Sequence, residues 1–223
     1  NRLLFAINTF NLSDTKAGFA IQQTSANAKN NLSSKDTTQA ATNWLFSIKQ
    51  LNVNNNEFRF DNNTATTQTN DGINYNHLFL QQFSLHSSNL LFTPTLYKGN
   101  ISQLSFQEQS GFSLQKCSVN FLYSDTAAYL QQLFIQTPYS VLKRSITARY
   151  PSLQQLTEKP EQVTVAVDLN HSIIGMKDVL FFQPSLQKNM KGRENETIQL
   201  HTQMNGSLQQ LTIPVFELSG LSN

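Results

Sequence analysis

The sequence predicts an elongated, all-β protein with one apolar and one polar sheet face. Three observations support this prediction. A short apolar unit recurs six times along the chain, apolar and polar residues alternate in the segments around it, and amide side chains rather than charges dominate the polar positions. Alternation with period two places every second side chain on the same face of a strand.

The repeated unit consists of a large apolar residue, two mostly polar residues, a second apolar residue, a spacer and a third apolar residue. The six copies read IKQLNV from Ile48, LQQFSL from Leu80, ISQLSF from Ile101, LQQLFI from Leu130, MKDVLF from Met176 and LQQLTI from Leu208. Their starts lie 32, 21, 29, 46 and 32 residues apart, which indicates a structural element separated by loops of varied length.

The spacing within the unit favours a strand. Its last two apolar positions are two residues apart and share one face of a strand. Its first two are three residues apart, so they need a bulge or an entering turn. Period-two alternation also predicts strands within residues 112–123, 163–169 and 198–204, with a change of phase near Cys117.

Three polar stretches are predicted to form loops, and one short segment is predicted to form a helix. The loops lie near residues 30–43, 61–72 and 188–196, within what we interpret as one elongated segment spanning residues 1–223. Ser152 followed by Gln155 forms a capping box, and Pro160 stops the helical pattern, so we expect one short helix near residues 152–158.

Composition excludes several classes of function. Only 13% of the 223 residues are charged, the net charge is +2 and the Lys and Arg residues are scattered. A nucleic-acid partner would need clustered cations or stacking aromatics along a groove, so we expect none. Asn and Gln together number 47, so amides and hydroxyls cover the solvent face.

The single Cys117 lies in an apolar strand pattern and is expected to be a buried, inert thiol.

We found no motif that predicts catalysis, a metal site or a cofactor. The four histidines, His77, His86, His171 and His201, lack the i+3 or i+4 partners of a metal motif. The carboxylates of Asp125, Asp168 and Asp178 lie at strand ends or on polar faces, where solvated carboxylates are common. No glycine-rich phosphate loop or nucleophile elbow is present in the sequence. The chain is therefore not expected to be an enzyme.

The sequence has no apolar run long enough for a membrane-spanning helix and no signal-peptide pattern. It begins at Asn1 without Met, so we expect a segment of a longer protein, with any anchor or export signal outside it.

Residues 72–220 resemble the periplasmic repeat region of the TamB-like proteins, within the wider AsmA-like group. The resembling segments are LFTPTLYKGNISQLSFQEQSGFSL from Leu91, LQQLFIQTPYSVLKRS from Leu130, YPSLQQL from Tyr150, VDLNHSIIGMKDVLFFQPSL from Val167 and NGSLQQLTIPVFELSG from Asn205. TamB-like proteins are the inner-membrane component of the translocation and assembly module. The match covers roughly two thirds of the chain, and the order of the motifs is its most specific feature.

The resemblance implies a long, strongly curved, groove-like β-sheet with an apolar concave face and a polar convex face. Such a segment lies in the periplasm of a Gram-negative cell, anchored in the inner membrane by sequence outside it, and extends toward an outer-membrane barrel partner. Its implied function is to shield phospholipid acyl chains during transport to the outer membrane, with a role in outer-membrane protein assembly. The expected groove lining comprises Leu51, Val53, Phe83, Leu85, Leu104, Phe106, Leu133, Ile135, Val165, Val167, Val179, Phe181, Leu211 and Ile213.

An alternative remains open at the level of sequence. Strands with one apolar face also build closed sandwiches and filled solenoids, as in a surface adhesin or scaffold. A polysaccharide-degrading β-helix would require an exposed cluster of Asp, Arg or Lys, and we found no such cluster. An open groove, a filled core and an exposed carboxylate cluster are the observations that separate these interpretations.

Overall fold

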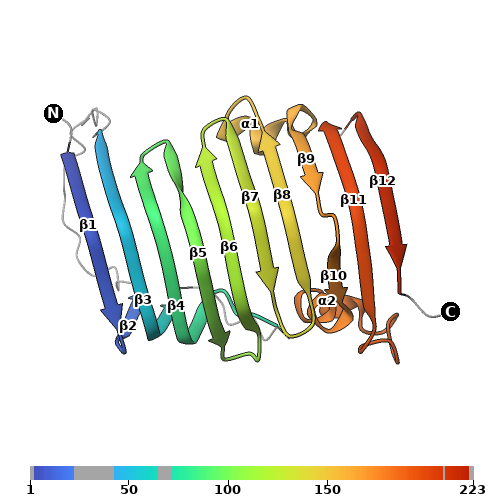
Figure 1. The fold of residues 1–223 in the computed structure, drawn as a ribbon, viewed down its shortest axis with the longest axis horizontal. Helices are drawn as coiled ribbons and strands as arrows, with labels where there is room; N and C mark the ends of the chain where they lie inside the picture. The colour runs from blue at the N-terminus through green and yellow to red at the C-terminus, as the bar shows by residue number, and fades with distance from the viewer. Residues whose placement is uncertain (1–2, 23–42, 65–71, 208, 221–223) are drawn as a thin grey trace, which may run out of the picture.

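A single twelve-stranded mixed sheet forms the body of the protein (Figure 1). The structure is a computed structural model and describes residues 3–22, 43–64, 72–207 and 209–220. The strands are β1 (Leu3–Ser13), β2 (Lys16–Ile21), β3 (Trp44–Asn62), β4 (His77–Thr93), β5 (Leu96–Glu108), β6 (Ser113–Ser124), β7 (Ala127–Gln136), β8 (Val141–Arg149), β9 (Thr164–Asp168), β10 (Ser172–Gly175), β11 (Thr197–Ser207) and β12 (Leu211–Ser219). The predicted all-β, elongated sheet is confirmed.

The strand order follows the sequence almost throughout. It runs β1-β3-β4-β5-β6-β7-β8-β10-β11-β12, with β2 paired to β3 and β9 paired to both β8 and β11. The first two strands run parallel to β3, whereas the other paired strands are antiparallel. The long connection from β2 to β3 includes residues 23–42, so most of the loop expected near residues 30–43 lies outside the described part. Residues 65–71 of the loop expected near residues 61–72 also lie outside the described part. Asp61 and Asn62, at the start of that expected loop, belong to β3.

β-bulges occur where the repeat spacing predicts them. The ladder between β4 and β5 shifts register between Gln81 and Ser84, and Gln82 has a φ of 51°. The ladder between β7 and β8 shifts between Leu130 and Leu133, and Gln132 also has a φ of 51°. One extra residue in the strand restores a three-residue spacing to a common face. The bulge predicted for LQQFSL and LQQLFI is therefore confirmed.

The other repeat copies differ from one another. In ISQLSF, the ladder between β5 and β6 shifts between Ile101 and Leu104, which confirms a bulge there. In IKQLNV, β3 and β4 keep one register from Ile48 to Val53, so their ladder has no register shift where the spacing predicted a bulge. In LQQLTI, Leu208 lies outside the described residues, and a bend at residues 209–210 leads into β12, which is the entering turn. A register shift between Leu104 and Phe106 accounts for the change of phase near Cys117.

The strand prediction for MKDVLF is wrong, because this segment forms helix α2 (Met176–Phe182). Met176, Val179 and Leu180 lie at positions i, i+3 and i+4, which places them on one side of a helix. Gly175 occupies the N-cap position, and Pro184 follows directly after the C-cap residue, where proline is common. An apolar pair three residues apart fits a helix without any bulge.

The short helix expected near residues 152–158 is present as α1 (Leu153–Glu158). The Gln155 backbone N–H donates a hydrogen bond to the Ser152 hydroxyl at 3.2 Å, as the capping box predicts. Pro160 then begins a short 3-10 turn that extends to Gln162. Both helices lie behind the sheet in the view of Figure 1, with α1 at the upper end of β7 and α2 at the lower end of β10.

The connection before β4 reaches α2 at the lower end of the sheet. A β-carbon on Gly72 would lie 2.8 Å from the carbonyl oxygen of Phe181 in α2. Four strands, β5 to β8, separate β4 from β10, which leads into α2. Gly72 precedes β4 by five residues, which can span about 16 Å, so this connection extends past the lower ends of the intervening strands to meet the helix.

The two faces are not enclosed as in a sandwich. Among the described residues, 10 hydrophobic side chains are buried and 18 large hydrophobic side chains are exposed. All twelve strands belong to one sheet, so no second sheet among the described residues covers its apolar side.

Glycine at the first bulge is predicted to stabilise the protein. Gln82 adopts a left-handed backbone conformation, which is unfavourable for residues with a β-carbon. We expect Gln82→Gly to raise the free energy of unfolding by about 0.5–1 kcal/mol. Urea titration of the purified chain measures this change.

The neighbouring Gln81 is the matched control, because it is exposed in the same strand without a positive φ. Gln81→Gly should instead lower the free energy of unfolding by about 0.5–1 kcal/mol, since glycine weakens a regular strand. Equal destabilisation by both substitutions would contradict the bulge at Gln82.

Candidate functional site

One sheet face collects the apolar side chains of successive strands, and we call it the apolar face. In β6 it presents Cys117, Val119, Phe121 and Tyr123, which alternate along a stretch of regular strand. Leu114, Cys117, Val119 and Leu133 form the buried cluster at its centre. Side chains of β5 and β7 pack against this cluster, so the face continues across neighbouring strands.

Strand pairing arranges the apolar face in rows that cross the sheet. One row joins Val53, Leu85, Leu104, Cys117 and Ile135 from β3 to β7. A second row, nearer the upper end, joins Phe121, Leu130, Ile146, Val167 and Met204 from β6 to β11. Directly paired side chains on one face of antiparallel strands are close enough to contact one another. The rows therefore form a continuous apolar surface.

Ten of the predicted lining residues lie on strands from β3 to β9. Val53 and Leu133 are buried, and the other eight are half-buried, namely Leu51, Phe83, Leu85, Leu104, Phe106, Ile135, Val165 and Val167. Leu211 and Ile213 lie on β12, the last strand of the sheet, and are 42% and 47% exposed. Partial exposure of so many apolar side chains distinguishes this face from a filled core.

The remaining two predicted lining residues lie on α2 rather than on a strand. Val179 and Phe181 are half-buried within the helix, so their strand placement is corrected. The Phe181 ring stacks on Phe112 with centroids 5.6 Å apart, and Phe182 meets Phe112 edge-on at 5.1 Å. Phe112 also lies 6.1 Å from Phe106. These rings cover the lower end of the apolar face.

Several residues of the face were not predicted as lining. They include Leu90 of β4, Phe121 of β6, Leu130 of β7 and Ile146 of β8. Phe121 could have been found from the alternation that begins at Val119. Leu130 is the first position of its repeat unit, and it reaches the face only because of the bulge at Gln132. The Leu90 side chain packs against Gly99 of β5. A β-carbon added to Gly99 would lie 2.5 Å from the Leu90 side chain.

Cys117 lies at the centre of the apolar face. It is buried, and burial raises the pKa of its thiol. A raised pKa keeps the sulfur protonated near neutral pH and lowers its reactivity. This environment agrees with the expected inert thiol and gives no support to a nucleophile.

A hydrogen-bonded carboxylate attaches α2 to the turn between β7 and β8. The hydroxyls of Thr137 and Ser140 both donate to the Asp178 carboxylate. Ser140 also accepts the Gly175 backbone N–H at 2.9 Å. The Lys177 ammonium lies 4.7 Å from the Tyr139 ring centroid. Asp178 is thus a structural group and not the solvated carboxylate that the sequence suggested.

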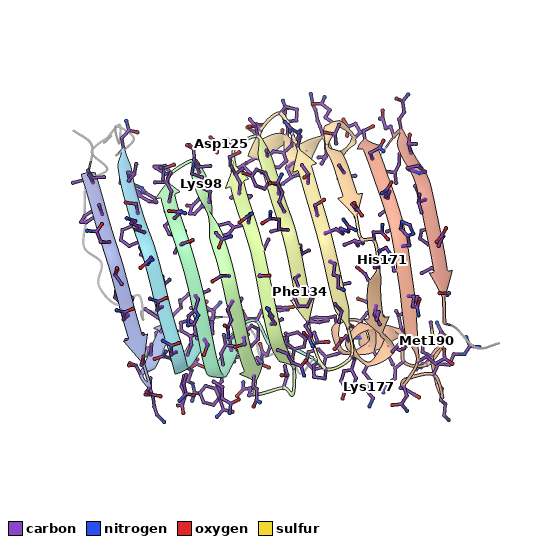
Figure 2. The ribbon with its side chains drawn as sticks, in the orientation of Figure 1. Lys98, Asp125, Phe134, His171, Lys177 and Met190 are labelled. Atoms are coloured by element: carbon purple, nitrogen blue, oxygen red, sulfur yellow. The ribbon has the colours of Figure 1, made fainter. Side chains whose placement is uncertain are left out.

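The opposite face is polar and carries amide ladders. The Asn100 side chain donates to Asn120, which in turn donates to the Gln132 side chain at 2.8 Å. Phe134 interrupts this polar surface, and the Lys116 ammonium lies 5.6 Å from its ring centroid. Figure 2 labels Phe134 on β7 and His171 between β9 and β10. Amides rather than charges provide the solvated face, as the composition predicts.

Polar clusters on the described residues are small. The His171 and His201 rings stack 5.9 Å apart, and His201 Nδ1 lies 3.4 Å from the Glu217 carboxylate. No group of three or more His, Cys, Asp or Glu side chains in the described ranges has the geometry of a metal site. Among these same residues, no helix is both long and apolar enough to cross a bilayer.

Comparisons with known proteins do not identify a relative. Neither a family model, nor a curated protein, nor a solved structure matches this chain.

Loss of the Asp178 carboxylate is predicted to release α2 from the sheet. Asp178→Ala leaves the Thr137 and Ser140 hydroxyls without their shared acceptor, so the free energy of unfolding should fall by about 1–3 kcal/mol. Hydrogen exchange should accelerate at the α2 amides. Asp125→Ala, which removes an exposed carboxylate from the turn between β6 and β7, serves as control. Unchanged α2 protection in Asp178→Ala would contradict this role.

Proposed function

We propose that this chain is a segment of a TamB-like, periplasm-spanning lipid-transfer protein. Its apolar face shields the acyl chains of phospholipids while they move toward the outer membrane. It acts as a binding surface and not as an enzyme. The proposal joins the resemblance of residues 72–220 to that family with the shape and polarity of the sheet.

The observation that carries the proposal is a broad apolar face over which the described strands place no second sheet. Rows of apolar side chains run from β3 to β11, and most of them are half-buried rather than buried. Apolar surface of this extent on a soluble protein is typical of a binding site for an apolar ligand. The polar opposite face tolerates water, so the sheet can separate an acyl chain from solvent.

The energetic benefit of such a face is large. Each methylene exposed to water costs about 0.8 kcal/mol, so two acyl chains with about 30 methylenes face a barrier of roughly 24 kcal/mol to free aqueous transfer. Continuous apolar rows lower this barrier at every step along the sheet. A narrow pocket would hold one lipid, whereas rows that cross many strands support movement.

The cellular setting follows from the family resemblance. We propose a periplasmic location, with an inner-membrane anchor in sequence outside this segment. The protein partner would be an outer-membrane barrel protein of the assembly-module type. Phospholipid would be the ligand, and nucleic acid would not bind.

A second candidate function, assistance of outer-membrane protein assembly, is favoured by the outermost strands. Among the described strands, β1 and β12 end the strand order, and both carry large exposed apolar residues, including Leu4 at 66% and Phe216 at 61%. Edge strands can pair with an added strand from another polypeptide. β1 contains no charged residue that would oppose such pairing.

A structural solenoid or adhesin with a filled core remains the competing class. It requires a second apolar layer against the face, and the described strands supply only one sheet. The two classes therefore differ in their response to a charge placed on the apolar face.

Leu130→Asp should abolish lipid binding without unfolding the protein. Leu130 lies in the upper row of the face and is 36% exposed, so a carboxylate there remains hydrated. It would, however, interrupt the apolar path of an acyl chain. Phospholipid retained by the purified protein is measured by mass spectrometry, and transfer is measured between fluorescent donor vesicles and acceptor vesicles.

Gln131→Asp is the matched control, because Gln131 is an exposed neighbour on the opposite face. It should leave lipid binding and transfer unchanged. Global unfolding of Leu130→Asp would support a filled core, since burial of an unpaired charge destabilises the fold. A folded Leu130→Asp protein with normal lipid content and transfer would refute the proposed function.

A further inference from the structure

The two ends of the apolar face differ in chemistry. At the upper ends of β3 to β6, four aromatic rings form a row that crosses the sheet: Phe46, Phe92, Tyr97 and Tyr123. Successive ring centroids lie 6.0, 5.9 and 6.1 Å apart. Trp44, the single tryptophan of the chain, begins β3 two residues before Phe46 and therefore lies on the same face. We call these five residues the aromatic rim.

The aromatic rim remains accessible. Tyr97 is 37% exposed and Tyr123 is 43% exposed, whereas Val119 and Leu114, lower on the face, are buried. Tyrosine and tryptophan combine an apolar ring with a polar group, and they concentrate where an apolar phase meets water. The rim thus has the composition of a boundary between acyl chains and polar headgroups.

The lower end is closed instead. Phe181 and Phe182 of α2 cover Phe112, and the Asp178 network holds the helix against the sheet. Tyr139 lies at the lower turn against Lys177 and Gly175, on the segment that leads into α2. Phe182 and Tyr139 are 51% and 45% exposed, so the two ends differ in the helix that lies over the lower end and not in the exposure of their rings.

We infer that a bound phospholipid lies with its headgroup at the aromatic rim and its acyl chains along the strands toward α2. This inference rests on the proposed function and adds an orientation to it. Along β6, the nine residue steps from Tyr123 to Leu114 span about 30 Å at roughly 3.3 Å per residue. One leaflet of a bilayer core is about 15 Å thick, so acyl chains that start at the rim reach the central rows.

Trp44 provides an intrinsic probe of this orientation. Bromine atoms on an acyl chain quench tryptophan fluorescence at short range, so their position along the chain reports depth. The purified chain is loaded with phosphatidylcholine that carries bromines near the glycerol backbone, at mid-chain or near the terminal methyl. We expect the greatest loss of Trp44 fluorescence with bromines near the glycerol backbone and the smallest loss with bromines near the methyl.

A second reporter tests the opposite end of the chain. In the Trp44→Phe, Phe106→Trp double variant, the tryptophan lies on β5 near the lower aromatic cluster, where Phe106 contacts Phe112. The order of quenching should reverse. Circular dichroism confirms that the variant retains its strand content.

The outcomes separate the orientation from the function itself. Equal quenching at all depths, or stronger quenching of Trp44 by bromines near the methyl, would overturn the orientation while the lipid-binding function stands. Absence of quenching together with absence of bound lipid would overturn both.

Discussion

The apolar face depends on β-bulges that correct the spacing of the repeat. Without the extra residue at Gln82 or Gln132, the first apolar residue of the unit would point to the opposite face. A one-residue slip in a strand moves every later side chain to the other face. The bulge lies at the polar pair between the first two apolar residues. Its second glutamine adopts a left-handed backbone conformation, which costs conformational free energy in a residue with a β-carbon. The bulges keep Leu80 with Phe83 and Leu130 with Leu133 on one surface.

The two faces of the sheet differ in what covers them. The α2 helix packs over the lower end of the apolar face, and the connection before β4 meets this helix at Gly72. The polar amide ladder through Asn120 lies on the opposite face, where it is compatible with solvent. One sheet thereby provides an apolar surface and a polar surface.

Much of the fold was predictable because strand chemistry is local. The repeat unit and period-two alternation predicted strands within β3 to β7, β9, β11 and β12, but not β1, β2, β8 or β10. Ser152 with Pro160 predicted the limits of α1. The failure at MKDVLF has a clear physical origin, since an apolar pair three residues apart suits either a bulged strand or a helical turn. Gly175 and Pro184 flank this copy and favour the helix. No local sequence pattern predicts the parallel pairing of β1 with β3 or the contact between Gly72 and α2. Both depend on residues that are far apart in the sequence.

The lining was predicted less completely than the strands. The repeat unit predicted Leu85, Leu104 and Ile135 as lining positions, and strand pairing joins them in one row across the sheet. The repeat could not indicate that the upper end carries aromatic rings while α2 covers the lower end, because strand register and the packing of the helix determine this difference.

The most direct test of the lipid-holding groove is photocrosslinking in cells from a probe at Val165. This residue lies on β9, paired with Ala148 and Gly206, and Thr164 on the opposite face serves as control. With radiolabelled lipid, we predict adducts on protein purified from the Val165 probe and none from the Thr164 probe. A folded protein without lipid adducts at Val165 would contradict the account and favour a scaffold with a filled core.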